Sequence, residues 1–129
     1  MSGEPIVLDS VIIIDHFNDV ADATAYLERV GERAVITAIT RAEVLTGFET
    51  TDAPLARALL DRFRLIPIDE HVADLAAQLR REHRWRLPDA LQAAAARLHG
   101  LRLATRNIKD FPPDRYPFVE VPYEIRAEP

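Results

Sequence analysis

Pro5-Ile-Val-Leu-Asp9-Ser10 is the stretch that decides the fold: a short apolar run that ends in an acid and then a hydroxyl residue. A run of this kind is typical of a buried strand in a parallel sheet that stops at a turn or at the start of a helix. The strand would deliver the carboxylate of Asp9 to its carboxyl end. We therefore expect a sheet that carries at least one acid along that edge.

Strands and helices are expected to alternate along the rest of the chain. Further strands are predicted at 34–37, 65–68 and 101–105, and one possible edge strand at 118–121 within the Pro-rich C-terminal tail, residues 112–129. Helical spacing is found at 11–17, 21–30, 40–47 and 54–63, in a segment that Asp69 caps and that ends near Arg84, and from Pro88 to Gly100. This alternation predicts an α/β domain with a mostly parallel sheet.

The composition is that of one globular domain. The chain has 129 residues, of which 48% are hydrophobic and 29% charged, so we expect residues 1–129 to form a single domain with a real core. The absence of cysteine excludes a disulfide framework, a thiolate metal site and a cysteine nucleophile, and it suits a reducing cytosol. We expect a cytoplasmic protein without a membrane segment. The formal net charge of -5 argues against a broad basic surface for nucleic acid.

Each acid near a predicted strand or helix end has an ordinary structural explanation. Asp9 could cap the helix that follows it. Glu43 lies three residues after Thr40, which is the spacing of a capping box. Asp89 follows Pro88 in the first turn of a helix, where the helix dipole favours any carboxylate. Asn107 and Asp110 could simply be a cap and a turn residue.

Taken together, these positions favour a metal site. Asp9, Glu43 and Asp89, with Asp110 or Asn107 as a fourth member, follow strands or begin helices packed on one sheet. In open α/β sheets, ligands bind at the carboxyl ends of strands near a switch in strand order. Carboxylates that converge there repel one another unless a cation lies between them. Oxygen donors select hard ions, so the pattern indicates Mg²⁺ or Mn²⁺.

Other enzyme classes fit the sequence poorly. No serine, histidine and acid set for a nucleophile is legible, and Asp9-Ser-Val lacks the second acid that haloacid-type phosphatases place after the first strand. The four glycines are isolated, so there is no phosphate-cradling loop and no organic cofactor is indicated. Metal-assisted hydrolysis of a nucleic acid backbone is the chemistry that remains.

The chain resembles the PIN-domain nucleases, and most closely the VapC-type toxins of type II toxin–antitoxin systems. Four motifs carry the resemblance, in order and with family-like spacing between Ile6 and Tyr123: Val-Leu-Asp9-Ser10, Thr37-Ala-Ile-Thr40-Arg-Ala-Glu43, Pro88-Asp89-Ala-Leu, and Ala104-Thr105-Arg-Asn107-Ile-Lys-Asp110-Phe.

The resemblance implies an α/β/α sandwich with about four or five strands and a Mg²⁺- or Mn²⁺-dependent endoribonuclease activity. It also implies a homodimer and a VapB-type antitoxin as partner. Asp9, Glu43 and Asp89 fall on the first three acids of the family, and Ser10 and Thr105 on its supporting hydroxyl residues. In many relatives an Asp stands where this chain has Asn107, with Asp110 three residues later, so the fourth position stays open between them.

Two further alternatives are open at this point. A basic run with one aromatic residue could bind RNA, or it could be a solvated helix end whose Trp85 packs into the core or a dimer interface; the run comprises Arg80, Arg81, Arg84, Trp85 and Arg86. The chain could also be a catalytically inactive PIN-like module that binds RNA or a protein. The retained set of mutually repelling acids argues against this second alternative.

Overall fold

The computed structural model describes residues 3–124 and contains one five-stranded parallel sheet. The strands are β1 (Ile6–Leu8), β2 (Ala34–Thr37), β3 (Arg64–Ile66), β4 (Arg102–Ala104) and β5 (Val119–Glu120), in the order β3-β2-β1-β4-β5. From β1 the chain adds β2 and β3 on one side, and then returns to add β4 and β5 on the other side of β1. The point at which the strand order switches therefore lies between β1 and β4.

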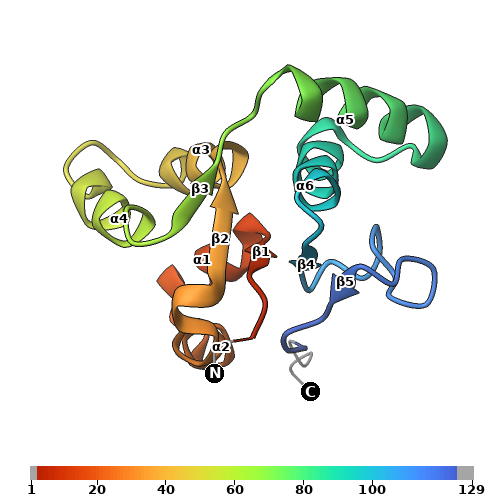
Figure 1. The fold of residues 1–129 in the computed structure, drawn as a ribbon. Helices are drawn as coiled ribbons and strands as arrows, with labels where there is room; N and C mark the ends of the chain where they lie inside the picture. Colours follow the sequence, from red (N-terminus) through yellow and green to blue (C-terminus); the bar gives the residue numbers. More distant parts are fainter. Residues whose placement is uncertain (1–2, 125–129) are drawn as a thin grey trace.

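Helices cover both faces of the sheet and make an α/β/α sandwich (Figure 1). They are α1 (Ser10–Phe17), α2 (Ala21–Val30), α3 (Ala38–Thr46), α4 (Ala53–Leu60), α5 (Glu70–His83) and α6 (Leu87–Leu98), with a short 3-10 turn η1 (Gly31–Arg33) before β2. The predicted α/β/α sandwich is confirmed, and the possible edge strand of the tail is β5. Residues 125–129 of that tail lie outside the described residues.

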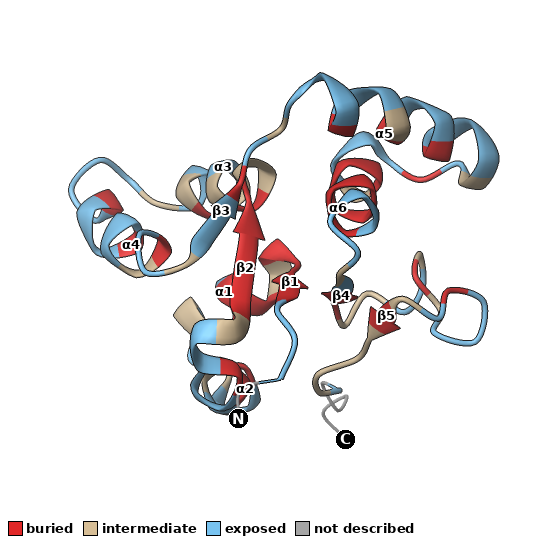
Figure 2. Cartoon of the chain, viewed as in Figure 1, coloured by how far each residue is buried: buried red, intermediate tan, exposed pale blue. Residues whose placement is uncertain are grey.

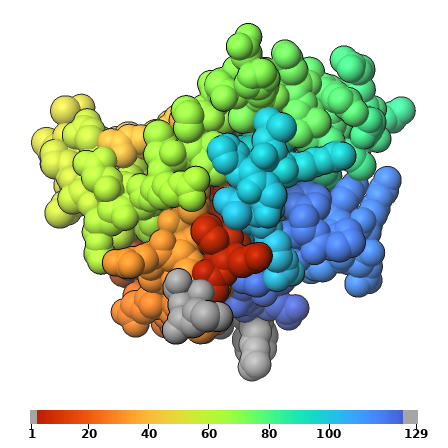
Figure 3. All heavy atoms as spheres, in the orientation of Figure 1, coloured from red at the N-terminus to blue at the C-terminus, as the bar shows by residue number. Residues whose placement is uncertain are grey.

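Successive side chains along each strand point to opposite faces of the sheet, so the core has two parts, one on each face. Val7, Val35 and Leu103 point to the face covered by α5 and α6, whereas Leu8 and Ile36 point to the face covered by α1 to α4. Because both faces are covered, β1 and β2 are buried at every residue (Figure 2). In the space-filling view the exposed red N-terminal segment lies between the orange and the cyan parts of the chain (Figure 3).

Helix α6 owes its central place to small side chains. Its residues 90–96 are all buried, and five of them are alanines, which let the helix approach both the sheet and α5 closely. Pro88 in the first turn and Gly100 with a positive φ of 65° just beyond the end set its limits. This helix fixes the position of Asp89 relative to β1.

The start of α3 differs from the prediction. The helix begins at Ala38 rather than near Thr40, because the Thr37 hydroxyl accepts from the Thr40 N–H (3.2 Å) and caps it. Glu43 is therefore inside the helix and does not form the capping box with Thr40. Its carboxylate is free to interact with residues outside α3.

Candidate active site

Asp9 lies at the switch point, where β1 ends and α1 begins. It is only 7% exposed, and three neutral donors satisfy its carboxylate. The Ser10 N–H donates to Oδ1 at 2.8 Å, the Thr105 hydroxyl donates to Oδ2 at 2.7 Å, and the Gln92 amide lies at 3.5 Å from Oδ1. Burial raises the pKa of Asp9, and these hydrogen bonds oppose that effect. The helix-capping role of Asp9 is thus real, and it leaves the carboxylate at the edge of a cavity.

Gln92 is a site residue that sequence reasoning missed. It is 1% exposed and links the end of β2 to α3: its amide donates to the Thr40 hydroxyl at 2.6 Å, and its carbonyl accepts from the Thr37 hydroxyl at 2.8 Å. The signal was present, since Gln92 is the one polar side chain in the run from 90 to 96. A buried amide inside an alanine-rich helix requires polar partners, and here those partners lead to Asp9.

Glu43 approaches the site from α3. Its Oε1 accepts from the Ser10 hydroxyl at 3.0 Å, so Ser10 contacts Asp9 through its backbone and Glu43 through its side chain. Burial raises the pKa of Glu43, and the charge of Asp9 raises it further. Ser10 therefore holds two carboxylates that repel each other.

Asp89 approaches from the first turn of α6. Burial raises its pKa to about 6, and the negative charges of Asp9, Asp110 and Glu43 add to the effect while Arg86 opposes it. Burial raises the pKa of all three acids, and the charge of Asp9 raises the pKa of the other two further, so the cluster is suited to accept a cation.

The acids line a cavity of about 390 Å³ over the carboxyl edge of β1 and β4. Three acids lie on it (Asp9, Glu43 and Asp89), and three cations surround them (Arg86, Arg106 and Lys109). The remaining lining residues are Ser10, Val11, Asn107 and Ile108. The cavity can therefore offer negative charge to a metal ion and positive charge to an anionic ligand.

The two candidates for the fourth position have different surroundings. Asn107 lines the cavity, and its N–H donates to the Thr105 hydroxyl at 3.0 Å. Asp110 lies beyond it: its carboxylate accepts from the Asn107 side-chain amide at 2.9 Å, and its carbonyl accepts from the Trp85 indole at 3.0 Å. The structure thus brings both near the acids, with Asn107 at the wall of the cavity and Asp110 behind it.

The basic run 80–86 divides into a buried residue and an exposed set. Trp85 is 6% exposed and packs on His83, Phe111 and Tyr116, which fits the alternative of a core position. It also lines a second cavity together with Arg80, Arg81 and Arg84, so RNA binding by this run stays a prediction. The guanidinium of Arg80 donates to the Trp85 carbonyl at 3.1 Å. Of the others, only Arg86 lines the acid cavity.

The donor set fits a hard divalent ion. Among residues 3–124 no group of three or more His, Cys, Asp and Glu side chains is gathered tightly enough to hold an ion unaided. Mg²⁺ does not require such a group, since it keeps several waters and commonly uses one or two carboxylates. The carboxylate oxygens of the lining and the repulsion among Asp9, Glu43 and Asp89 match that mode of binding.

Fold and site together define a nuclease-type α/β/α domain, with carboxylates gathered at the switch point of a parallel sheet and cations around them. The chain belongs to the PIN domain family, whose sequence pattern matches residues 6–112. This identification confirms the family resemblance seen in the four sequence motifs. Within the described part of the chain, no helix has the length and apolar character needed to cross a bilayer.

Similar proteins include a named ribonuclease and a chain of a toxin-antitoxin complex. Ribonuclease VapC10 of Mycobacterium tuberculosis is 34% identical over 114 residues, which are 83% of this chain and 86% of that protein. A toxin-antitoxin complex from Klebsiella pneumoniae contains a chain 37% identical to this one, with a TM-score of 0.86 and coverage of 93% of this chain and 99% of that chain. FitAcB from Neisseria gonorrhoeae is 25% identical, with a TM-score of 0.76 and the same coverage.

The burial of Asp89 beside other acids predicts an unusual pH dependence of stability in the metal-free protein. The folded-state pKa of Asp89, about 6, lies above its ordinary value of 3.8, so the folded state binds more protons than the unfolded state between those limits. In chelator, the wild type should therefore gain stability as the pH falls from 7.5 to 5. Asp89→Asn should be more stable than wild type at pH 7.5, and this difference should shrink at pH 5.

Urea unfolding at the two pH values measures this effect. Asp74→Asn is the matched control, because Asp74 is an exposed acid on α5 that does not line the cavity. If the wild type were more stable than Asp89→Asn at pH 7.5 in chelator, the claim that the fold disfavours the ionised form of Asp89 would be contradicted.

Proposed function

We propose that this chain is a cytoplasmic, Mg²⁺- or Mn²⁺-dependent endoribonuclease and the toxin of a VapBC-type toxin–antitoxin pair. The observation that carries the proposal is the cavity at the switch point, where Asp9, Glu43 and Asp89 meet. The likeness to a protein named as a ribonuclease, at 34% identity, supports RNA as the substrate. The absence of cysteine from the sequence supports the cytoplasmic location.

Asp9 and Asp89 are the residues that would hold the ion, with Glu43 and Asn107 acting directly or through water. A bound ion of this kind lowers the pKa of a water and neutralises charge on a phosphodiester. Thr105 and the Ser10 N–H keep Asp9 oriented, and the Ser10 hydroxyl keeps Glu43 oriented. In-line attack of water on phosphorus would leave a 5′-phosphate on the product.

We assign Asn107 to the cavity wall and Asp110 to its support. Asp110 accepts from the Asn107 amide, which turns the Asn107 carbonyl oxygen into the part of the side chain left for a ligand. The negative charge of Asp110 also reaches Asp89, whose pKa it raises. Asn107 thus contributes a carbonyl oxygen to the site and Asp110 a negative charge. Asp110 could bind an ion only if its hydrogen bond with Asn107 were broken.

The exposed cations would bind the RNA backbone. Arg86 and Lys109 line the acid cavity, and Arg81 and Arg84 are exposed on the neighbouring surface at the end of α5. Because their contacts would be with phosphates, they would give affinity without sequence preference. Arg80 can join them through the part of its guanidinium that does not bind the Trp85 carbonyl.

RNA cleavage tests the proposed activity and separates it from the inactive module. We expect the wild type to cut an RNA mixture with Mg²⁺ or Mn²⁺ and to stop when chelator is added. Asp9→Asn and Asp89→Asn should each lower kcat/KM at least about a hundredfold, because each removes several kcal/mol of transition-state stabilisation. The exposed-acid variant Asp74→Asn should cut like wild type. Full activity of both cavity variants, or of the wild type in chelator, would contradict the proposal.

The partner in our proposal is an antitoxin of the VapB type, and the toxin itself would be a homodimer. The support for the antitoxin is the likeness to a chain in a toxin-antitoxin complex, at a TM-score of 0.86. An uncontrolled ribonuclease harms its own cell, so an inhibitor that covers the cavity is chemically sensible.

Cell growth tests the toxin role. Expression of the wild type alone should arrest growth, Asp9→Asn should not, and co-expression of the neighbouring antitoxin reading frame should restore growth and yield a stable complex. Normal growth with active wild-type enzyme present would contradict the toxin role, while leaving the ribonuclease activity intact.

A further inference from the structure

Arg106 differs from the other cations at the acid cavity because its guanidinium is fixed. Its Nε and Nη2 donate to the two carboxylate oxygens of Asp15 at 2.6 and 2.9 Å. In the part of the chain that the structure describes, the side chains of Arg86 and Lys109 form no hydrogen bond or ion pair. Arg106 is therefore the cation whose position at the cavity is set before any ligand arrives.

Asp15, which holds Arg106, belongs to α1, the helix that Asp9 caps. It is 5% exposed, and its Oδ2 also accepts from the Tyr123 hydroxyl at 2.8 Å. Burial opposes its ionisation, but the bonds from Arg106 and Tyr123 outweigh burial and lower the pKa of Asp15. A buried, ionised carboxylate with these two partners holds the guanidinium in one position.

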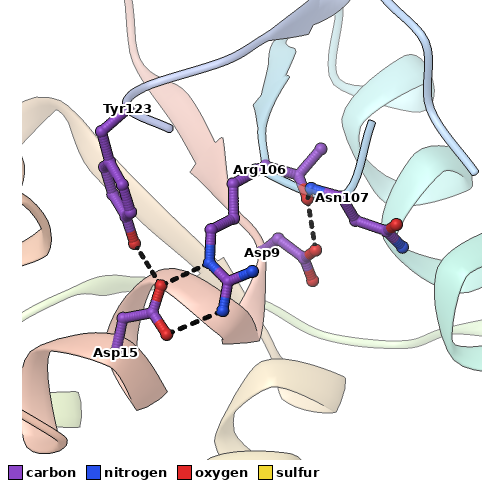
Figure 4. A network of polar contacts seen from close by, with 6 residues as sticks. Asp9, Asp15, Arg106, Asn107 and Tyr123 are labelled. Atoms are coloured by element: carbon purple, nitrogen blue, oxygen red, sulfur yellow. Dashed lines mark hydrogen bonds and ion pairs between the residues drawn. The ribbon is translucent and has the colours of Figure 1, made fainter. Parts of the chain in front are cut away.

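The remaining donors of Arg106 face the active site. Figure 4 shows the guanidinium between Asp15 and Asp9, with Nη1 directed away from Asp15 towards the side on which Asp9 and Asn107 lie. Arg106 also lines the acid cavity together with Asp9 and Asn107. The side chain is 32% exposed, so a ligand in the cavity can reach it.

We propose that Arg106 is a substrate-binding residue: Nη1 donates to a non-bridging oxygen of the RNA phosphate that enters the acid cavity, while Asp15 and Tyr123 hold the guanidinium in place. This inference rests on the proposed function, which makes RNA the substrate. Arg106 lies inside the fourth sequence motif, which gave it no role, and outside the basic run 80–86.

The physical need for such a residue follows from the charges of the site. Three carboxylates repel a phosphate, so the phosphate must gain attraction at a place where it does not displace the metal. Arginine is suited to this task because its guanidinium is planar and always charged, and it can bind a carboxylate on one edge and a phosphate on another. Because Asp15 fixes the guanidinium in advance, little orientational entropy is lost when the phosphate binds.

RNA binding without cleavage tests the contact. The probe is a fluorescein-labelled single-stranded RNA oligonucleotide in chelator, with anisotropy read at several salt concentrations. Arg106→Gln should bind about tenfold more weakly, the loss of one charge-assisted contact. Its plot of log affinity against log salt should be shallower by about 0.7, the value for one phosphate contact with a single strand. Arg106→Lys, which keeps the charge, should keep the slope and lose less affinity.

Arg102→Gln is the matched control. Arg102 precedes Arg106 by four residues, is also ion-paired to a carboxylate (Glu120, 3.0 Å), and lies at the opposite end of β4. It should bind like wild type. If Arg106→Gln has the affinity and salt slope of Arg102→Gln, the inference is overturned, whether or not the wild type cleaves RNA. If instead the Arg106 effect is found and the wild type never cleaves, the proposed activity fails and the contact stands.

Two variants test whether orientation matters. Asp15→Asn makes the protein less negative, so simple electrostatics predicts tighter RNA binding, whereas loss of the fixed guanidinium predicts a severalfold fall in kcat/KM. Tyr123→Phe removes only one hydroxyl and should lower kcat/KM in the same way but by a smaller factor. If Asp15→Asn does not fold, Tyr123→Phe alone tests whether the orientation of the guanidinium matters. Binding and cleavage equal to or better than wild type in the folded variants would overturn the role of Asp15 and Tyr123.

Discussion

The rest of the site depends on one constraint: a carboxylate is buried where the central strand β1 ends beside β4, and neutral donors bind it. Within residues 3–124, Asp9 has a backbone N–H, a threonine hydroxyl and a distant amide as partners, and no direct ion pair with a cation. Such a group keeps its negative charge only at a cost, which a counter-ion in the adjoining cavity would relieve. The acids Glu43 and Asp89 increase that cost, because they approach the same cavity from two other helices.

The fold explains why these groups meet. The strand order places β1 beside β4, so the residues that follow them, Asp9 and Thr105, come together although they are 96 positions apart. Small side chains in α6 bring Asp89 and Gln92 close to the end of β1. A parallel sheet with a switch between β1 and β4 therefore produces the site by topology, and loops add Arg86, Arg106, Asn107 and Lys109 to its lining.

The α/β class, its sheet and the three acids could be predicted because each has a local signal. The run before Asp9 is apolar, Pro88 marks a helix start directly before Asp89, and the acids fall within the four family motifs. The capping of α3 by Thr37 could not be predicted, since Thr37 and Thr40 are both good caps and only packing chooses between them. The burial of Trp85 was open for the same reason, because an aromatic residue in a basic run suits both RNA and a core.

Long-range pairs escaped sequence reasoning entirely. Asp15 and Arg106 are separated by 91 residues, and nothing in the motif around either one indicates the other. Gln92 had a local signal, a polar residue in an alanine run, but its partners on α3 and β2 become visible only when the helix is packed. Polar networks of this kind depend on the tertiary arrangement. A family motif can therefore include a residue of the network without indicating which residue it contacts.

The central claim is that the acid cavity exists to bind a divalent ion at Asp9. Anomalous diffraction from crystals of the wild type soaked in Mn²⁺ tests it most directly. We expect an anomalous peak in the cavity at direct coordination distance from the Asp9 carboxylate, with water completing the ligands, and loss of the peak in Asp9→Asn crystals. Manganese bound elsewhere with the cavity free of it, or an unchanged peak in Asp9→Asn, would contradict the account.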